Sequence, residues 1–458
     1  MKKLISLMGI SLLATSATVV TVACGKRDNE LRVVFIPSQN QTEVEATTAS
    51  LEKLLTQELK KKAAARGSEF KKRVKVTTSQ NYDIAGQSLA NGNEDIGFLP
   101  VNTYSAFRGN KQADGTYDKL GVLLTAGRAG VTPETTFKDF KNNEKFDETK
   151  AVSKMSNETS LGLVKNYKKS VEEAKPTGNE GYSKKIYDTA NPALYYRSYA
   201  FANIPILKEL KIENDITTNT TFKGKSYYEA IEELLKNDQK NDNFKKYQEV
   251  LKSLIKNPKV KIGVGKSKTS SSGFLYPVLW LKDFVGLTDQ EIVDMLTKKD
   301  TERRIVKALS YTESAKIIGD KNVKAENSKY AITFGFSDIR FRDRQTDGKS
   351  ENEVKKVREE EKDLFDNSIV IGASQSIFND GISYSKSPKS ALKDKNLLDD
   401  LRKSFIDLIN ENQEAKKIFK IYNHEKYVSP ESTIDEKISK SNATGIEDIK
   451  KLVKNINW

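Results

Sequence analysis

The chain has 458 residues, of which 31% are charged and 37% hydrophobic, and its formal net charge is +14. This length is sufficient for two lobes that each bury a core. The excess of basic residues favours anionic ligands or proximity to anionic lipid. It does not predict nucleic-acid binding, because no basic stripe is interleaved with aromatic residues and no reader motif is present.

The N-terminal residues predict an export signal with a lipid attachment site. Two lysines precede an apolar segment, residues 4–20, that is too short for a stable membrane span. Cys24 follows a small alanine and is the only cysteine, so an internal disulfide is excluded. This pattern resembles a bacterial lipobox; the alternative is a soluble secreted protein with an incidental cysteine. We expect a signal peptide over 1–23, a lipidated tether over 24–30, and lipid attachment to the extracytoplasmic face of the cell membrane.

Strands and helices alternate in the first part of the sequence. The apolar patterns predict strands at 31–37, 73–78, 95–99 and 120–125, and helices at 43–62 and 82–91. Such alternation indicates a parallel sheet. Ligands bind at the carboxyl ends of the strands in sheets of this kind. The segments that follow the first three strands are polar there, at 38–41, 79–82 and 101–104.

Two segments rich in lysine, asparagine and glutamate interrupt the middle of the chain, at 132–187 and 214–257. We expect the first to be largely a surface insertion. The second contains two amphipathic patterns that predict helices at 227–236 and 244–255. A strand-like segment at 194–203 lies between the two.

The segment from 260 to 281 is the strongest candidate for a binding site. A short strand at 260–264 and an apolar helix at 274–281 flank a run of hydroxyl residues and a glycine, namely Thr269, Ser270, Ser271, Ser272 and Gly273. A helix start presents unpaired N–H groups and the positive end of the helix dipole. With the hydroxyl donors added, the segment suits a phosphate, phosphonate or similar oxyanion.

An ordinary N-cap in a serine-rich loop is the alternative interpretation of this segment. A P-loop nucleotide site is not expected, because no Walker lysine follows the glycine.

The last third of the chain again mixes strands and helices. A capping-box pattern predicts a helix at 288–298, and 349–362 is a charged hinge or an exposed helix. Strands are expected at 330–336, 368–374 and 382–385, the last of them after a turn at Asn379, Asp380 and Gly381. Amphipathic patterns predict helices at 395–410, 414–422 and 446–456.

Several of these segments together resemble the phosphate, phosphite and phosphonate-binding proteins of ABC importers, the PhnD-like branch of the type II solute-binding proteins. The motifs are LRVVFIPSQN, LANGNEDIGFLPVNTYSAF, YYRSY, SKTSSSGFLYP, FGFSDIR and the segment that begins IFNDGISYSKSP, in the order in which the family has them. They cover a little over half of the mature chain.

The resemblance implies a two-lobed α/β fold, with two mixed, mostly parallel sheets flanked by helices and joined by two hinge strands. Residues 31–125 would begin lobe 1 and residues 126–370 would form lobe 2 with the charged insertions. Residues 371–458 would contain the return crossing and the C-terminal helices that complete lobe 1.

The resemblance also implies a set of ligand-binding residues. The hydroxyls of Thr269, Ser270, Ser271 and Ser272, and N–H groups near Gly273, would donate to the ligand's oxygens. Tyr104 and Tyr196 would hydrogen-bond the anion or stack on its substituent, and Asp338 would accept from a protonated oxygen or an amino group. Thr103 and Ser38, at polar strand ends, complete the candidate set.

Each of these assignments has a structural alternative. The tyrosines could be core aromatics, Asp338 could be a turn or cap residue, and Ser38 could be an ordinary loop residue, which we favour. Many family members place a histidine in the cleft, in the region that here reads SYTESA from Ser310, whereas the single histidine of this chain is His424.

These observations predict a substrate-binding component of an ABC importer, which would close by hinge motion around a phosphonate, phosphite or phosphate and deliver it to permease and ATPase subunits. Neutral donors, rather than a salt bridge, would bind the anion. A larger phosphate ester, such as a thiamine phosphate or a nucleotide, is the alternative ligand.

A surface adhesin and an extracytoplasmic hydrolase are the alternative functions. The hydrolase is disfavoured because no serine–histidine pair, cysteine nucleophile or metal-ligand spacing is apparent. We expect no catalytic residue, metal site or cofactor.

Overall fold

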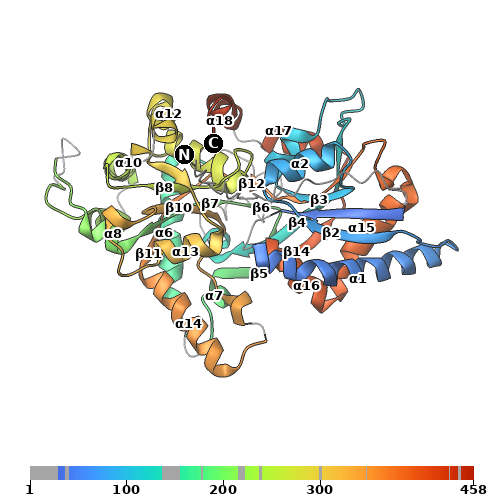
Figure 1. The fold of residues 1–458 in the computed structure, drawn as a ribbon. Helices are drawn as coiled ribbons and strands as arrows, with labels where there is room; N and C mark the ends of the chain where they lie inside the picture. The colour runs from blue at the N-terminus through green and yellow to red at the C-terminus, as the bar shows by residue number, and fades with distance from the viewer. Residues whose placement is uncertain are drawn as a thin grey trace, which may run out of the picture.

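The protein folds into two lobes that lie side by side (Figure 1). The computed structural model describes residues 29–36, 41–136, 155–176, 179–214, 222–236, 240–298, 302–346, 348–432, 434–441 and 445–458. Each lobe contains a mixed sheet with flanking helices, and a two-stranded ribbon lies between them. This is the two-lobed α/β fold that the sequence predicts. The signal peptide, Cys24 and Ser38 lie outside the described residues.

Lobe 1 is built on a seven-stranded sheet with the order β14-β4-β13-β3-β1-β2, and with β5 paired to β4. Its strands are β1 (Glu30–Phe35), β2 (Arg73–Thr78), β3 (Ile96–Leu99), β4 (Leu120–Val131), β5 (Tyr187–Ala193), β13 (Gly381–Ser385) and β14 (His424–Val428). Strands β2, β1 and β3 are parallel, as their alternation with helices predicts. The other pairings are antiparallel and include strands from the second half of the chain.

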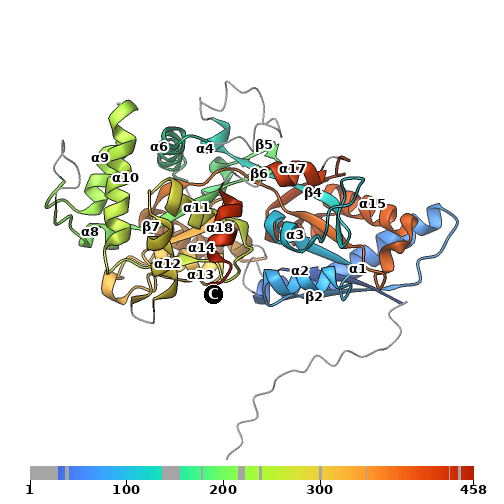
Figure 2. The same ribbon diagram turned by 90° about the horizontal axis from the view of Figure 1, so that it is seen from above.

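Helices cover both faces of this sheet (Figure 2). They are α1 (Gln41–Ala65), α2 (Tyr82–Ala90), α3 (Val101–Phe107), α15 (Lys395–Glu411), α16 (Gln413–Phe419) and α17 (Ile434–Ser441). The apolar stripe that predicts α15 is buried at Leu397, Leu401, Phe405 and Leu408, and α15 packs against α1 and β14. Burial of one apolar stripe is what holds a surface helix in place.

Lobe 2 is built on a five-stranded sheet with the order β11-β7-β10-β8-β9. Its strands are β7 (Ser198–Asn203), β8 (Ile262–Val264), β9 (Ile305–Lys307), β10 (Ile332–Phe336) and β11 (Ser368–Ala373). The helices of this lobe are α4 (Thr132–Thr135), α6 (Asn157–Glu173), α7 (Ser183–Ile186), α8 (Ile204–Glu209), α9 (Tyr227–Lys236), α10 (Lys240–Lys256), α11 (Tyr276–Asp283), α12 (Asp289–Thr297), α13 (Tyr311–Ile318) and α14 (Glu351–Asp366). Both α12 and α14 begin with a capping box, which is why the charged segment before β11 is a helix.

The two charged insertions contribute to the core of lobe 2 as well as to its surface. Helix α6 buries Leu161, Val164 and Tyr167 and packs against β11. In the second insertion, α9 and α10 form where the sequence predicts them, and the buried Tyr247 hydroxyl of α10 donates to the Ile371 carbonyl at 2.9 Å. The first insertion is therefore less superficial than the sequence predicts, because α6 has one apolar face within a polar composition.

Two short strands, β6 (Tyr195–Tyr196) and β12 (Ile377–Phe378), pair antiparallel between the lobes. They are the two crossings that the sequence predicts. The chain also passes between the lobes near the C-terminus, where α17 packs against α3 of lobe 1 and α18 (Ile446–Val453) packs against α11 and α12 of lobe 2. The last helix thus differs from the expectation that all C-terminal helices complete lobe 1.

Two local features near the return crossing also differ from the sequence prediction. His424 lies on strand β14, between the helices predicted at 414–422 and 446–456, and its side chain is fully buried. Asn379 and Asp380 do not form a hairpin turn but lead from β12 into β13. Gly381 is required there because a Cβ would lie 2.1 Å from the Leu124 carbonyl oxygen.

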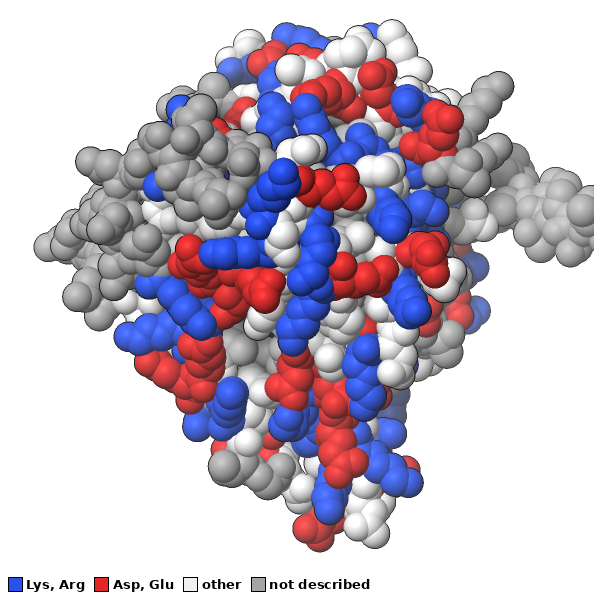
Figure 3. All heavy atoms as spheres, turned by 90° about the vertical axis from the view of Figure 1, so that its left-hand side faces the viewer, with Lys and Arg blue, Asp and Glu red and all other residues white. Residues whose placement is uncertain are grey.

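Charged side chains of both signs alternate over the described surface of lobe 2 that faces away from lobe 1 (Figure 3). This mixture agrees with the interpretation of most charges as a solvated surface. None of the helices among the described residues is long and apolar enough to cross a membrane.

Candidate functional site

The serine-rich segment forms a tight loop between β8 and α11 that faces lobe 1. One turn of π-helix, Ser271–Leu275, precedes α11, and such turns are frequent at functional sites. The Gly265 N–H donates to the Gly273 carbonyl at 2.6 Å. A Cβ on Gly265 would lie 3.2 Å from the Gly273 backbone, so the loop closes only because the two glycines allow this approach.

Part of the hydroxyl set joins the loop to lobe 1. The hydroxyls of Ser267 and Thr269 each donate to the Asp83 carboxylate of α2 at 2.7 Å. The Asn102 amide donates to the Ser271 hydroxyl at 3.0 Å, and the Thr103 and Thr269 hydroxyls lie 3.2 Å apart. In this closed arrangement, Thr269 and Thr103 serve as contacts between the lobes.

The remaining hydroxyls face a small cavity of about 20 Å³ between the lobes. This volume is about that of one or two water positions. Ser270, Ser271 and Ser272 line it from lobe 2, and the Ser272 hydroxyl lies 3.1 Å from that of Tyr311. The other lining residues are Ile36, Tyr82, Pro100, Arg128, Tyr196, Phe336, Asp380 and Tyr422.

Arg128 is the main residue of this cavity that sequence reasoning missed. It lies within β4 and is only 5% exposed. Its guanidinium carbon lies 4.2 Å from the ring centre of Tyr196 and 4.9 Å from that of Phe336. Nη2 donates to the Asp380 carboxylate, whereas Nε and Nη1 have no hydrogen-bond acceptor. Buried donors of a charged group without acceptors are costly, so this arrangement favours an anionic ligand.

Asp380 is the second residue that the sequence did not reveal, because its motif resembles a turn. Burial alone would raise the pKa of Asp380, but the charge of Arg128 and the interaction with His424 hold that pKa below its usual value. His424 lies behind Asp380, with Nε2 at 3.8 Å, and its Nδ1 lies 3.0 Å from the Tyr427 hydroxyl. Burial lowers the pKa of His424, so His424 is neutral at pH 7 and Asp380 is charged.

Three of the four tyrosines that line the cavity have hydroxyls suited to donate to a ligand, whereas the Tyr422 hydroxyl donates to the Ile36 carbonyl. Burial raises the pKa values of Tyr82, Tyr196 and Tyr311, which therefore remain protonated and can donate hydrogen bonds. Tyr311 stands in the region where the resembling family has a cleft histidine. The sequence indicated that region but not the role of the tyrosine.

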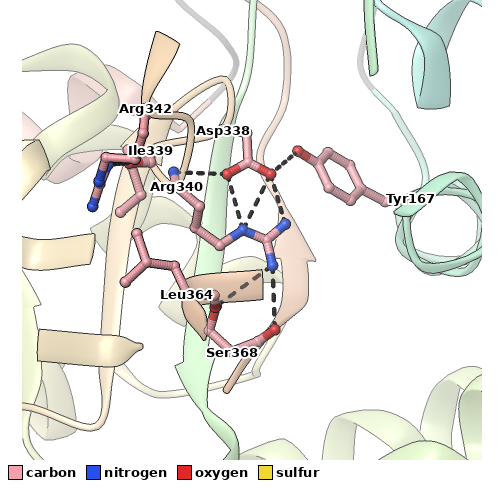
Figure 4. Close-up of polar contacts among 7 residues, drawn as sticks. All are labelled: Tyr167, Asp338, Ile339, Arg340, Arg342, Leu364 and Ser368. Atoms are coloured by element: carbon pink, nitrogen blue, oxygen red, sulfur yellow. Dashed lines mark hydrogen bonds and ion pairs between the residues drawn. The ribbon is translucent and has the colours of Figure 1, made fainter. Parts of the chain in front are cut away.

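Two predicted residues lie away from this cavity or are already paired. The Tyr104 hydroxyl donates to Asp435 at 2.7 Å. Asp338 accepts hydrogen bonds from Tyr167 at 2.6 Å and from both Nε and Nη2 of Arg340 (Figure 4). With both of its oxygens engaged, Asp338 has a structural pairing that the sequence could not show.

The site therefore combines one buried guanidinium, several neutral donors and one carboxylate. This set can bind a small anion and orient it by hydrogen bonds. Among the described residues, no group of three or more histidine, cysteine, aspartate or glutamate side chains is placed to hold a metal ion.

The fold is a two-lobed α/β architecture with a small cavity between the lobes. Comparison with solved structures finds a putative thiamine pyrophosphate transporter protein, Mh-p37 of Mycoplasma hyorhinis, at 13% identity and a TM-score of 0.51, over 90% of this chain and 98% of that one. This likeness shows the shared fold.

Two further solved structures match with lower TM-scores. The binding-protein component of an ABC phosphonate transporter from Pseudomonas aeruginosa has 11% identity and a TM-score of 0.45, over 93% of this chain and 89% of that one. PhnD1 from Prochlorococcus marinus, in complex with methylphosphonate, has 13% identity and a TM-score of 0.44, over 94% of this chain and 100% of that one. No protein-family model and no curated protein matches the sequence.

Proposed function

We propose that the protein is the substrate-binding component of an ABC importer and that it captures a phosphorus oxyanion between its lobes. The observation that carries this proposal is Arg128, whose unpartnered nitrogens Nε and Nη1 are buried beside the serine loop. An anion there would receive charge-assisted hydrogen bonds from the guanidinium and neutral ones from Ser270, Ser272 and tyrosine hydroxyls. The proposed donor set thus includes the charged guanidinium, in addition to the neutral donors that the sequence predicts.

Two features support an oxyanion, and the second of them supports a phosphorus compound. The π-helical turn and α11 place a helix start at the cavity, where backbone N–H groups and the dipole favour an oxyanion. The fold is that of a protein described as a putative thiamine pyrophosphate transporter. Phosphonate, phosphite and phosphate are the first candidates, and a larger phosphate ester is the alternative.

Attachment and partners complete the proposal. Cys24 would carry the lipid that anchors the protein to the extracytoplasmic face of the cell membrane. The two lobes would close on the ligand and present it to permease and ATPase subunits. In this role the protein binds its substrate without chemical change.

A thermal-shift panel of phosphate, phosphite, methylphosphonate, AMP and thiamine monophosphate tests this function. A ligand that binds only the folded state raises the melting temperature according to its concentration and affinity. At least one phosphorus compound should raise it, whereas sulfate and acetate should not. Absence of a shift across the panel, with protein shown to be free of bound ligand, would contradict the proposal and favour a surface-interaction role.

Alanine variants of the serine loop test the site itself. Ser270→Ala and Ser272→Ala should each weaken binding of the active compound by about 1–3 kcal/mol, since each removes a donor to a buried charge. Ser404→Ala is the matched control, because Ser404 is fully buried on α15, away from the cavity. Unchanged affinity in both loop variants, with the fold intact, would exclude the serine loop from the site.

A further inference from the structure

A second, larger cavity adjoins the small one. Its volume is about 440 Å³, which lies within the usual range for pockets that hold organic ligands. Arg128, Tyr196, Tyr311 and Phe336 line both cavities. The two spaces therefore meet at the guanidinium and the rings around it, and we call the larger one the chamber.

The polar lining of the chamber is incompletely paired. Ser337 is 7% exposed and Arg342 is 1% exposed, yet the Ser337 hydroxyl and Nη2 of Arg342 have no hydrogen-bond partner. Arg342 extends away from the Asp338–Arg340 pair (Figure 4). The Gln345 side-chain oxygen is also unpartnered. Buried polar atoms are nearly always paired, so three such residues on one wall indicate a missing polar partner.

The backbone at Ser337 supports the same conclusion. Its φ is +53°, a left-handed conformation that is uncommon for residues other than glycine. Strained residues of this kind cluster at ligand-binding sites, where the surrounding structure holds them. Ser337 follows β10 directly and lies between Phe336 and the Asp338–Arg340 pair.

Aromatic rings line another part of the wall, beside charged side chains that include Glu134, Lys184 and Glu425. Tyr187 and Phe341 have ring centres 4.7 Å apart, and Tyr195 and Phe336 also line the chamber. Such rings provide flat apolar surface on which a planar group can stack. A compartment with aromatic walls and a few unpaired polar atoms fits a flat ring that carries hydrogen-bonding atoms.

We propose that the ligand spans both cavities, with its phosphorus oxyanion at Arg128 and the serine loop and a planar, polar organic group in the chamber. The cargo is then an organic phosphate or phosphonate, rather than orthophosphate or phosphite, and Ser337 is a specificity-determining residue. This inference rests on the proposed function and names the substrate class for the same site.

Titration calorimetry with methylphosphonate, phenyl phosphate and AMP tests the proposal. Burial of a ring should make phenyl phosphate and AMP bind at least ~30-fold tighter than methylphosphonate. Ala129→Trp, at a half-buried position on the chamber wall, should remove most of that gain and leave methylphosphonate within about threefold of its original affinity. The tryptophan would occupy the space in which the ring is buried, so most of the ~30-fold gain in affinity from apolar burial would be lost.

Ser337→Ala provides a second and milder test. It should weaken AMP about tenfold, the effect of one lost hydrogen bond, and leave phenyl phosphate unchanged. Ser404→Ala removes an equally unpartnered buried hydroxyl outside both cavities and should change neither.

Equal affinity for all three compounds, together with indifference to both chamber variants, would overturn this inference and leave the proposed function standing. If none of the three compounds nor orthophosphate binds, the proposed function itself fails.

Discussion

Two buried arginine–aspartate pairs in this protein differ in how completely they are satisfied. In lobe 2, the Arg340 side chain donates to both oxygens of Asp338 and to the Ser368 carbonyl, and Tyr167 donates to the same aspartate (Figure 4). Between the lobes, Arg128 donates to Asp380 through Nη2, and its Nε and Nη1 remain unpartnered.

We propose that the difference separates a structural pair from a ligand-binding one. A buried charge costs free energy unless every polar atom around it is paired. The Asp338–Arg340 pair meets this condition with protein atoms alone, whereas Nε and Nη1 of Arg128 have no acceptor among the described residues. Sequence reasoning selected Asp338 for the ligand, and the structure adds Arg128 as a candidate.

Asp338→Asn should give the largest loss of stability. It leaves the buried charge of Arg340 uncompensated, which costs about 3–5 kcal/mol of unfolding free energy. Urea denaturation measures this loss, and the folded fraction should bind ligand with unchanged affinity. A larger effect on affinity than on stability would mean that Asp338 contacts the ligand and would break the comparison.

The double variant Arg128→Met, Asp380→Asn should have the opposite profile. Removing both charges of a buried pair is often neutral for stability, so we expect a change within about 1 kcal/mol. Affinity for the phosphorus compound should fall at least ~100-fold, because the charged donors are gone. Arg340→Met with Asp338→Asn is the matched control and should retain affinity; equal behaviour of the two double variants would refute the distinction.

Glu94 sharpens the comparison because it is a half-buried acid outside both cavities, and one of its oxygens is buried without a partner. Burial raises its pKa to about 7, against the hydrogen bond from Thr77. A carboxyl group can thus lose its charge by protonation, whereas an arginine stays charged.

Since the pKa of Glu94 is higher in the folded state, its contribution to stability is present below pH 4.5 and is lost as the pH rises through 7. Glu94→Gln should therefore raise the unfolding free energy by about 1–3 kcal/mol at pH 8 and little at pH 4.5. Thermal melts across this range measure the effect, with the exposed Glu69→Gln as control. A constant gain at all pH values would indicate that protonation of Glu94 is not responsible.

Local patterns in the sequence were sufficient for much of the fold. The alternation around β1, β2 and β3, the stripe of α15 and the capping box of α12 each depend on neighbouring residues, and all three are confirmed. The places of β14 and α18 depend on distant partners, so local periodicity did not reveal them.

The same limit applies to the candidate site. The serine loop was visible because helix starts and hydroxyls are local signals. Arg128 and Asp380 are 252 positions apart in the sequence, and only the fold brings them together. Likewise, the pairing of Asp338 with Tyr167 from a charged insertion could not be read from composition.

The C-terminal passage of the chain between the lobes is short. Helix α17 ends at Ser441 against lobe 1 and α18 begins at Ile446 against lobe 2. Five peptide units span at most about 18 Å when fully extended. If the lobes open so far that the end of α17 and the start of α18 are more than this distance apart, one of the two helices must detach from its lobe. Two sets of hydrogen bonds oppose that release on the lobe 2 side. The Lys268 ammonium donates to the carbonyls of Val453 and Ile456, at and after the end of α18. The Trp458 ring N–H donates to the Gly265 carbonyl beside the serine loop. The C-terminal segment thus limits how widely the two lobes can open.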